Sequence, residues 1–561
     1  MKKLINEPAA VVPEMLEGLV RLYPGLRLLA DANVVMREAA SGEVAIISGG
    51  GAGHEPAHAG YVGEGLLHAA VAGDVFTSPS TDAVLAAIRA VAGPAGVLLV
   101  VKNYTGDRLN FGLAAEMARA DGIPAEVVIV NDDMALDAGP ETAGRRGIAG
   151  TVLIHKVAGA AAAAGLDLAS VKAEAEAAVA ALGTMGVALS PCTIPAAAGP
   201  SFSLGEDEIE LGLGIHGEAG VRRSRIEPAD TLVRTLLTRI ISEMPLAAGD
   251  RVALLVNNLG GTPMMELMIV ARRALTMLEG HGITVERAWT GTFLTAIEMA
   301  GCSLSLMKLD DRRLAYLDAT ADAPAWVRGH PPQRLEPPDA VVAAEEKPGT
   351  SSPRFEAVLR AVCAALAEAE PRLTALDQVV GDGDLGISLQ RGAAAVMQAL
   401  PSLNLANPSA ALTALSLLLR RVLGGTSGPL YAIMLLRGAR HLAAGDPGDP
   451  RTWSDAFAAG VQALAELGDG RAGDRTMLDA LLPAAAALRR ALDEGAAIGP
   501  AVAAAAKAAQ EGAAATANMP PRRGRSSYLA ERVAGHRDPG AEAVAIWLAA
   551  TAASISWQAP I

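Results

Sequence analysis

The stretch EVAIISGGGAGHEPAH, residues 43–58, carries a short apolar run directly into a glycine-rich loop. The run at 43–48 is rich in branched aliphatic residues and stops at glycine, which is typical of a buried strand. Similar runs at 96–102 and 125–131 are separated from it by glycine turns and helical stretches. Apolar strands that alternate with helices lie between layers of helices. The stretch therefore predicts α/β units on a parallel or mixed sheet, with the glycine loop at a strand end.

A second α/β domain is indicated further along the chain. At 561 residues the chain exceeds what one hydrophobic core usually organises. After an alanine-rich helix, strand-like runs recur at 187–190, 209–215, 251–257 and 284–290. We therefore expect one α/β domain over residues 1–185 and another over residues 186–330.

The composition changes after the second domain. Prolines, charges and a Gly-Thr-Ser-Ser run block helix and strand in residues 331–354, which predicts an interdomain linker. Residues 355–561 are rich in alanine and leucine with helical periodicity. This pattern predicts an all-helical barrel or bundle whose loops carry its polar residues.

Charge and cysteine content limit the functional classes. The net charge of −14 and the pI near 5.2 argue against binding to nucleic acid or an anionic membrane, which needs a concentrated basic face. The three cysteines are far apart and lack metal or redox spacing, which fits a reducing compartment. Asn6, Glu7 and Pro8 interrupt any signal-peptide core, and the apolar stretch 543–557 is too short to span a bilayer. We expect a cytoplasmic protein.

The glycine loop is a candidate ligand site. Its glycines let backbone N–H groups approach a small oxygen-rich ligand, as in an anion-binding loop. A dinucleotide site remains an alternative, although Pro56 stands where the phosphate-binding helix should begin. A histidine is often only a core or surface residue, but His54 lies beside four glycines at a strand end. That position favours contact with a substrate.

Two further segments place polar side chains after strands. KNYTGD, residues 102–107, puts Lys102, Asn103 and Asp107 at the usual rim of an α/β crevice. A polar turn that only caps the strand is the alternative. GLGIHGE, residues 212–218, sets His216 between glycines at the end of an alternating run, a weak signal by itself.

The helical half contains three carboxylates within eight positions, Asp377, Asp382 and Asp384, the last two on either side of a glycine. Like charges so close are costly unless a cation neutralises them, and a hard divalent ion with oxygen ligands, Mg²⁺ by default, explains them well. A solvated acidic turn is the alternative, and the spacing does not fit an EF-hand.

Glycine-bearing loops follow at 424–429, 468–477 and 524–540. Helix N-termini with small residues can bind phosphates through free amides and the helix dipole. Each of these loops alone is an ordinary helix cap.

Taken together, the motifs resemble those of one family. GGGAGHEPAHAGYVGEG, FTSP at 76–79, KNYTGD, TAGRRG at 142–147 and GLGIHGE resemble the substrate-binding subunit of dihydroxyacetone kinase over nearly all of 1–330. GDGD and the later glycine loops resemble the nucleotide-binding domain of the same family over 355–557. The resemblance implies a single-chain kinase with a substrate-binding half and a helical Mg–ATP-binding domain.

For the substrate half, the resemblance implies that His216 bonds to the ketone carbon and holds the substrate as a hemiaminal. It makes Asp107 and His54 the catalytic partners, and it assigns substrate binding to Gly51, Lys102, Asp107 and His216. The chemistry is sensible because a neutral imidazole can add to a carbonyl, whereas glycerol has no such carbon. Asp107 would accept the proton of the attacking hydroxyl, and His54 would orient the bound oxygen.

For the nucleotide half, the resemblance implies that Asp377, Asp382 and Asp384 hold Mg²⁺. The implied ATP-binding residues are Leu385, Gly386, Ile387, Ser388, Thr426, Ser427, Gly468, Met477, Arg525, Asp538, Pro539 and Gly540. No Walker A sequence is present, so phosphate binding would depend on metal and helix ends. Leu385 departs from the more polar or small residue that relatives commonly carry, which argues against a side-chain contact there and leaves a contact through its backbone.

The function implied is ATP-dependent phosphorylation of dihydroxyacetone, related short-chain ketoses or glyceraldehyde. Fusion of the two halves favours free ATP over a phosphotransferase-system partner. The alternatives are a kinase of tetroses such as erythrulose, an FAD-splitting cyclase activity, and a non-catalytic sensor that acts as a transcriptional co-regulator. Because relatives exchange these domains, a homodimer with domain-swapped sites is expected, with no nucleic-acid or membrane partner.

Overall fold

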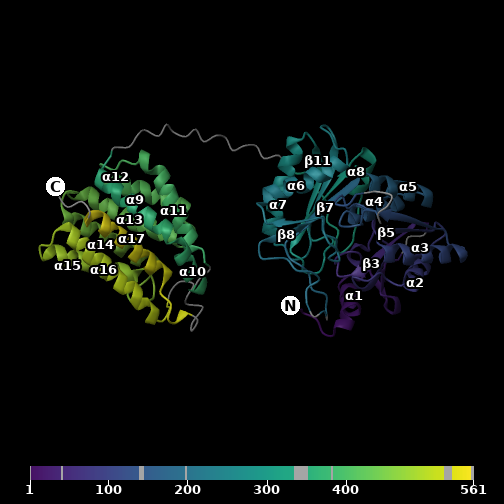
Figure 1. The fold of residues 1–561 in the computed structure, drawn as a ribbon, viewed down its shortest axis with the longest axis horizontal. Coiled ribbons are helices and arrows are strands. Elements are labelled where there is room, and N and C mark those ends of the chain that lie inside the picture. Colours follow the sequence, from purple (N-terminus) through teal and green to yellow (C-terminus); the bar gives the residue numbers. More distant parts are fainter. Residues whose placement is uncertain are drawn as a thin grey trace. The chain divides into compact units, whose positions relative to one another are not determined.

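The structure is a computed structural model that describes residues 2–556, apart from 39–41, 138–143, 196, 198, 334–350, 381–382 and 523–532. It divides into two compact units, Met1–Leu335 and Glu336–Ile561, each described here by itself (Figure 1). Most of the predicted linker, residues 331–354, lies outside the described residues.

The first sheet of the N-terminal unit has the strand order β1-β2-β4-β3-β5-β6. Strands β3 to β6 pair in parallel, whereas β1 and β2 add antiparallel pairs at one edge. The strands are β1 (Arg27–Leu29), β2 (Val34–Met36), β3 (Ala45–Ala52), β4 (Ala69–Val75), β5 (Val97–Lys102) and β6 (Ala125–Val130). The mixed sheet predicted from the apolar runs is confirmed.

Helices cover both faces of this sheet. They are α1 (Val11–Leu22), α2 (Thr81–Val91), α3 (Thr105–Ala120), α4 (Thr151–Ala163) and α5 (Leu168–Ala180). Successive residues of a strand face opposite sides, so Leu98 packs in the cluster that contains α4, and Leu99 packs in the cluster that contains α3. Every residue of β5 is therefore buried, which explains its continuous apolar sequence.

The second sheet has the order β11-β10-β12-β7-β8-β9, with one parallel pair, β10 with β11. Its strands are β7 (Leu182–Ala188), β8 (Glu208–Leu211), β9 (Arg222–Arg225), β10 (Arg251–Asn258), β11 (Thr284–Gly291) and β12 (Gly301–Lys308). Helices α6 (Ala229–Glu243) and α7 (Met264–Gly280) share its apolar core, and α8 (Asp311–Asp318) follows β12. The second α/β layer is thus present, and it begins with β7 at Leu182.

One predicted strand is shorter than expected. The run 209–215 forms a strand only to Leu211, and residues 212–218 form a loop. Gly212 and Gly217 have φ values of +68° and +83°, a region that L side chains avoid, so the chain leaves the sheet here. This loop carries His216.

The described part of the C-terminal unit is all-helical, as predicted. Its helices are α9 (Pro353–Glu368), α10 (Glu370–Val380), α11 (Leu385–Ala399), α12 (Pro408–Val422), α13 (Ser427–Ala444), α14 (Pro450–Gly468), α15 (Leu478–Asp493), α16 (Ile498–Ala515) and α17 (Pro539–Ser556). Small residues such as Ala484 and Ala505 are buried where α15, α16 and α17 share one apolar cluster. The alanine tracts therefore serve close helix packing.

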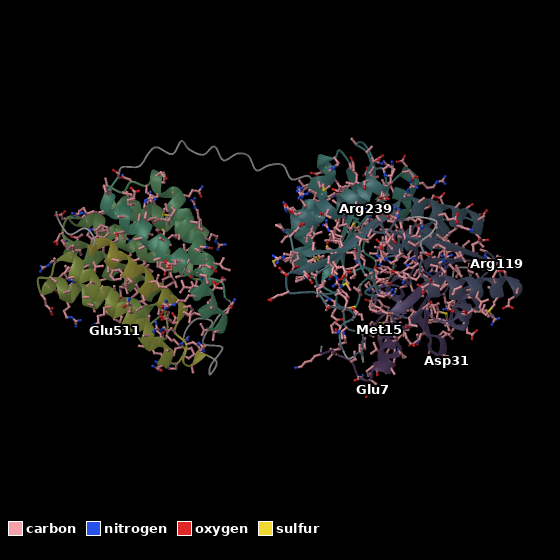
Figure 2. All side chains as sticks on the ribbon, viewed as in Figure 1. Glu7, Met15, Asp31, Arg119, Arg239 and Glu511 are labelled. Atoms are coloured by element: carbon pink, nitrogen blue, oxygen red, sulfur yellow. The ribbon has the colours of Figure 1, made fainter. Side chains whose placement is uncertain are left out.

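Charged side chains such as those of Arg119 and Glu511 lie on the outside of their units (Figure 2). Among the described residues, no helix is both long and apolar enough to cross a bilayer.

Candidate active site

The predicted substrate-site residues of the N-terminal unit come together from four segments. His54 lies in the loop after β3, Lys102 ends β5, Asp107 lies in the first turn of α3, and His216 lies in the loop after β8. The ring centroids of His54 and His216 are 4.8 Å apart. Nζ of Lys102 lies 4.0 Å from Oδ2 of Asp107. Tyr104 connects the two pairs, because its ring lies 4.7 Å from that of His216 and 5.9 Å from Nζ of Lys102.

His216 is held in one tautomer by Glu218. Nδ1 of His216 lies 2.7 Å from Oε1 of Glu218, and the His216 backbone N–H donates to Oε2 at 2.9 Å. Burial alone would raise the pKa of Glu218, but the hydrogen bond and charge of His216 and nearby backbone N–H groups lower it to about 2. A carboxylate only accepts, so in the neutral form of the ring Nδ1 carries the proton and Nε2 keeps its lone pair.

His54 has a complementary arrangement. Its Nδ1 lies 2.7 Å from the carbonyl oxygen of Thr295, which can only accept, so Nδ1 is the donor. Burial, together with the charges of Lys102 and His216, places the pKa of His54 well below its usual value. The ring is therefore neutral, and its buried Nε2 has no hydrogen-bond partner among the described residues. Nε2 is an acceptor available to a ligand hydroxyl.

Lys102 is also available for a ligand. Its side chain is fully buried, and Nζ has no hydrogen-bond partner among the described residues. Burial lowers the pKa of Lys102, while the negative charges of Asp107 and Glu218 oppose that shift. Buried polar atoms are almost always hydrogen-bonded in folded proteins, so unpartnered ones at a loop junction mark a place for a ligand or water.

Gly51 lets the end of β3 pack closely against the segment after β4. A Cβ on Gly51 would stand 2.5 Å from the backbone N of Thr77 and 2.7 Å from the carbonyl carbon of Phe76. Such contacts are too short for any side chain, so only glycine lets β3 approach the segment after β4 this closely. Gly51 is therefore placed beside the histidine loop.

Four residues near His216 were not predicted as site residues: Phe76, Tyr104, Glu218 and Thr295. Phe76 stacks on His54 at 5.1 Å and meets His216 edge-on at 5.3 Å. Three of them lie within the FTSP, KNYTGD and GLGIHGE motifs. The motifs therefore pointed to these segments, but the prediction chose other residues as the site residues. Thr295 contacts His54 through its backbone carbonyl. Any residue type has that group, so the sequence gives no sign of the contact.

The second histidine of the glycine loop belongs to a different pair. Nδ1 of His58 lies 2.9 Å from Nε2 of His155 on α4, and both rings are buried. Burial, with the charge of Lys102 as a smaller cause, lowers the pKa of His155 to about 3. The pair is therefore neutral and ties the glycine loop to α4.

In the C-terminal unit, two of the three predicted metal ligands are described. Asp377 is buried near the end of α10 and accepts a hydrogen bond from the backbone N–H of Leu385 at 3.2 Å. Asp384 stands at the N-cap position of α11 without a capping hydrogen bond from its side chain, and it is exposed. Asp382 lies outside the described residues, and among the residues described no group of three metal-ligating side chains was found.

The charge around Asp377 nevertheless suits a divalent cation. Burial raises the pKa of Asp538 to about 6, the charges of Asp479 and Asp377 add to that effect, and Arg475 opposes it. Several carboxylates thus gather where α10 ends and α17 begins. Carboxylate oxygens are the ligands that Mg²⁺ prefers, so the residues present fit that ion.

The predicted ATP-binding loops lie at helix N-termini that contact each other. Oγ of Ser388 on α11 accepts a hydrogen bond from the backbone N–H of Gly424 at 3.2 Å, which joins the first loop to the second. A Cβ on Gly540 would stand 3.5 Å from Cβ of Met477, which joins the start of α15 to that of α17. Thr426 and Ser427 begin α13, and Gly468 ends α14. Arg525 lies outside the described residues.

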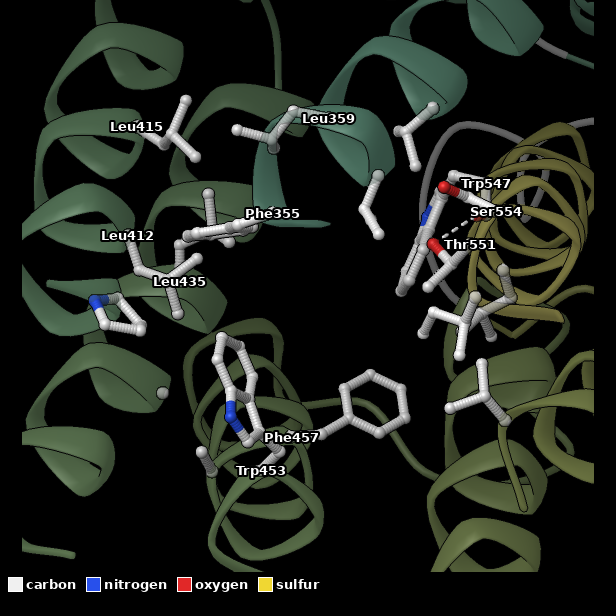
Figure 3. Close-up of a pocket in the computed structure, with 18 of the residues that line it drawn as sticks. Phe355, Leu359, Leu412, Leu415, Leu435, Trp453, Phe457, Trp547, Thr551 and Ser554 are labelled. Carbon is white, nitrogen blue, oxygen red and sulfur yellow. Dashed lines mark hydrogen bonds between the residues drawn. The ribbon is translucent and has the colours of Figure 1, made fainter. Parts of the chain in front are cut away.

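A large apolar cavity also lies in the C-terminal unit, and the sequence did not predict it. Its volume is about 1210 Å³, and aromatic residues such as Phe355, Trp453, Phe457 and Trp547 line it (Figure 3). None of the predicted metal or ATP residues lines it. It is therefore distinct from the predicted nucleotide site.

Comparison with known proteins agrees with this arrangement. The Dak1 domain model matches residues 17–325, and the DAK2 domain model matches residues 379–553. A "Putative 3,4-dihydroxy-2-butanone kinase" of Solanum lycopersicum is 46% identical, over 99% of this chain and 98% of the relative. A "Triokinase/FMN cyclase" of Homo sapiens is 44% identical, over 98% of each chain.

The solved structures agree as well. The dihydroxyacetone kinase from C. freundii, solved in complex with AMP-PNP and Mg²⁺, is 35% identical over 99% of each chain, with a TM-score of 0.61. With both domain models and relatives of matching length, the chain is an enzyme that belongs to the dihydroxyacetone kinase family.

Proposed function

We propose that the protein transfers the γ-phosphoryl group of ATP to dihydroxyacetone, and to related short-chain ketoses or glyceraldehyde, after His216 has captured the carbonyl. The observation that carries this proposal is the 2.7 Å contact between Nδ1 of His216 and Glu218, which leaves the lone pair of Nε2 free. A neutral imidazole nitrogen of this kind is a competent nucleophile toward a ketone.

The capture step balances without any other reagent. Nε2 of His216 bonds to the carbonyl carbon, and the π electrons of the carbonyl move to its oxygen. That oxygen takes one proton from water, and Nδ1 releases one proton to water past Glu218, which stays a carboxylate, so the product is a neutral hemiaminal and no proton is gained or lost overall. Glycerol has no carbonyl carbon, so it cannot be held in this way.

The remaining residues then act on the held substrate. Asp107 accepts the proton of the terminal hydroxyl as that oxygen attacks phosphorus. Nε2 of His54, an acceptor without a protein partner, orients a substrate hydroxyl. Lys102 and the backbone of Gly51 bind the substrate oxygens, which uses the unpartnered Nζ of Lys102.

ATP would bind at the helix N-termini of the C-terminal unit, where free amides and helix dipoles favour phosphate. Mg²⁺ would be held there by Asp377, Asp382 and Asp384 and would neutralise phosphate charge. Phosphoryl transfer requires the ketose and ATP in one complex. We propose a homodimer in which the helical unit of one copy serves the substrate unit of the other.

A substrate panel tests this function. Dihydroxyacetone, glyceraldehyde, both erythruloses and glycerol are each offered with ATP and Mg²⁺, and phosphate ester formation is measured. We expect dihydroxyacetone to be phosphorylated and glycerol not to be. Phosphorylation of glycerol alone would rule out carbonyl capture, and activity that is insensitive to a chelator would rule out the metal role of the aspartates.

Preference for a four-carbon ketone is a second candidate. It is favoured by the Solanum lycopersicum relative, whose name specifies 3,4-dihydroxy-2-butanone. The name of the Homo sapiens relative includes an FMN cyclase, so a cyclising cleavage of FAD is worth measuring in the same assay. Higher kcat/KM for an erythrulose than for dihydroxyacetone would establish the tetrose preference.

A further inference from the structure

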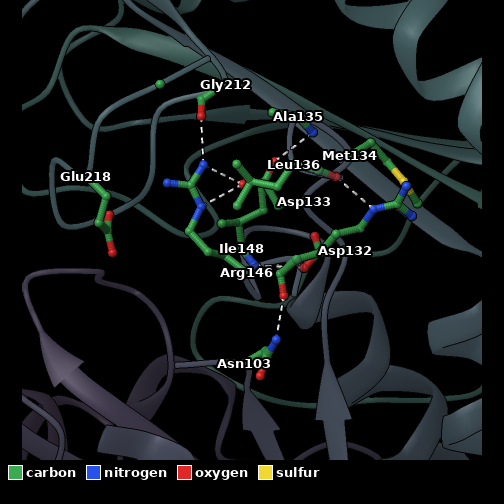
Figure 4. Close-up of polar contacts among 12 residues, drawn as sticks. Asn103, Asp132, Asp133, Met134, Ala135, Leu136, Arg146, Ile148, Gly212 and Glu218 are labelled. Atoms are coloured by element: carbon green, nitrogen blue, oxygen red, sulfur yellow. Dashed lines mark hydrogen bonds and ion pairs between the residues drawn. The ribbon is translucent and has the colours of Figure 1, made fainter. Parts of the chain in front are cut away.

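The TAGRRG motif has no part in the function proposed so far, yet its second arginine lies beside the His216 loop. Arg146 is almost fully buried. Its Nε and Nη2 lie 2.8 Å and 2.7 Å from Oδ2 of Asp133, and Nη2 also donates to the carbonyl oxygen of Gly212 at 2.7 Å (Figure 4). One guanidinium thus connects the segment after β6 to the first residue of the loop 212–218.

Asp133 is itself held firmly. Its Oδ1 accepts from the backbone N–H of Ala135 at 3.0 Å, and its own N–H donates to the carbonyl oxygen of Arg146. The neighbouring Asp132 accepts from the backbone N–H groups of Ile148 and Gly150 at 2.7 and 2.9 Å. Hydrogen bonds to the backbone fix Asp133, and Asp133 in turn fixes the guanidinium of Arg146. The contact of that guanidinium with Gly212 therefore constrains the loop 212–218.

Gly214 shows how close Arg146 comes to Glu218. A Cβ on Gly214 would stand 2.6 Å from Nη1 of Arg146 and 2.1 Å from Oε2 of Glu218. Both charged groups therefore occupy the space that a side chain would take, and they lie within about 5 Å of each other, a distance at which partly buried opposite charges attract. Glu218 in turn binds His216 through Nδ1 and the backbone N–H.

We propose that Arg146 is a positioning residue for His216. Anchored on Asp133, it fixes the loop through Gly212 and places its charge beside Glu218, so that Glu218 keeps Nδ1 of His216 protonated and Nε2 directed to the ketone. The inference rests on the proposed carbonyl capture. An arginine suits this role because its planar guanidinium contacts the Asp133 carboxylate and the Gly212 carbonyl while Nη1 stays near Glu218, and a lysine has no such set of nitrogens.

The test compares Arg146→Ala with Arg145→Ala. Arg145 is the neighbour in the motif, and its side chain is also paired, with Glu243 at 2.6 Å and the carbonyl oxygen of Leu136 at 3.1 Å. Among the described residues, its side chain has no hydrogen bond or ion pair to Gly212 or Glu218. We expect Arg146→Ala to slow formation of the His216 adduct about 10- to 100-fold, the range for losing a charged hydrogen bond. The KM for the ketose should rise while the KM for ATP stays unchanged.

Chemical rescue distinguishes a positioning role from a purely structural one. Guanidinium ion, added at a non-denaturing concentration, should restore part of the adduct rate of Arg146→Ala and none of that of His216→Asn. Should Arg146→Ala not fold, Arg146→Lys keeps the charge, and it should still slow capture because one ammonium cannot replace Nε, Nη1 and Nη2 together.

The outcomes separate the two proposals. If the unmodified protein forms no adduct, the proposed function itself is wrong. An adduct that forms in Arg146→Ala at the unmodified rate, an equal loss in Arg145→Ala, or a folded Arg146→Ala that guanidinium does not rescue would each overturn the role of Arg146 alone.

Discussion

Nζ of Lys102 lies where a side chain on Gly50 would begin. A Cβ on Gly50 would stand 2.6 Å from that nitrogen and 3.6 Å from Oδ2 of Asp107. The φ of Gly50 is +154°, which also disfavours any other residue. The side chains of Lys102 and Asp107 thus pack against the backbone of β3 at Gly50.

Gly50→Ala should therefore displace Lys102 and weaken substrate binding. We expect the ketose KM to rise at least about 10-fold, since small misplacements in a site cost up to 100-fold. Gly112 on α3 is the matched control, because a Cβ there meets nothing within 4 Å. Gly112→Ala should keep the KM and stabilise the helix by ~1 kcal/mol. Steady-state kinetics of both variants check this, and an unchanged KM in Gly50→Ala would contradict it.

Asp107→Asn separates capture from transfer. The amide keeps the shape of the carboxylate but cannot accept the hydroxyl proton, so turnover should fall about 10²- to 10⁴-fold. The His216 adduct should still form, because Asp107 is not bonded to His216. Intact-protein mass spectrometry detects the adduct, and His216→Asn gives the background without it. Normal turnover in Asp107→Asn would remove the general-base role.

The sequence predicted what depends on local pattern. The buried run of β5 and the alanine-rich helices were recognisable because their packing repeats at strand or helix spacing. The loop 212–218 was read as the end of a strand, since alternation continues to Ile215 while the glycines at 212 and 217 turn the backbone away. Residue type alone did not reveal that turn.

The site could be predicted only in part, for a related reason. His54, Lys102, Asp107 and His216 each stand beside glycine or a strand end, and the family motifs contain them. The hydrogen bond between His54 and the backbone carbonyl of Thr295 joins residues 241 positions apart in the sequence. The one between Arg146 and Gly212 joins residues 66 positions apart. Contacts between distant segments depend on the tertiary fold, so neither could be inferred from spacing.

The raised pKa of Asp538 predicts a stability that depends on pH. Burial raises the pKa of this carboxyl from 3.8 to about 6, so the folded state binds its proton more tightly than the unfolded state does. The contribution of Asp538 is therefore most favourable below about pH 4 and is lost as the pH rises through 6. Asp538→Asn keeps the hydrogen bond from the Ala541 N–H but cannot ionise.

We therefore expect Asp538→Asn to be as stable as the unmodified protein near pH 4 and more stable at pH 8, by ~1–2 kcal/mol given that the residue is half-buried. Calorimetry of the full chain from pH 4 to pH 8 measures the change. Asp493, exposed at the end of α15, is the control, and its replacement by Asn should give the same difference at every pH in this range. A gap for Asp538→Asn that does not widen with pH would contradict the burial of its carboxylate.

The proposed homodimer is tested by combining two inactive variants. His216→Asn disables carbonyl capture and Asp377→Asn disables nucleotide binding, so each alone should be inactive. If the helical unit of one copy serves the substrate unit of the other, a mixed dimer contains one complete pair of units, and co-expression should restore about a quarter of the activity. Co-expression of His216→Asn with Asp107→Asn is the control, because both changes lie in the substrate unit and no arrangement supplies an intact one. Co-purification of two differently tagged copies shows whether mixed dimers form, and mixed dimers without activity would mean that each copy uses its own two units.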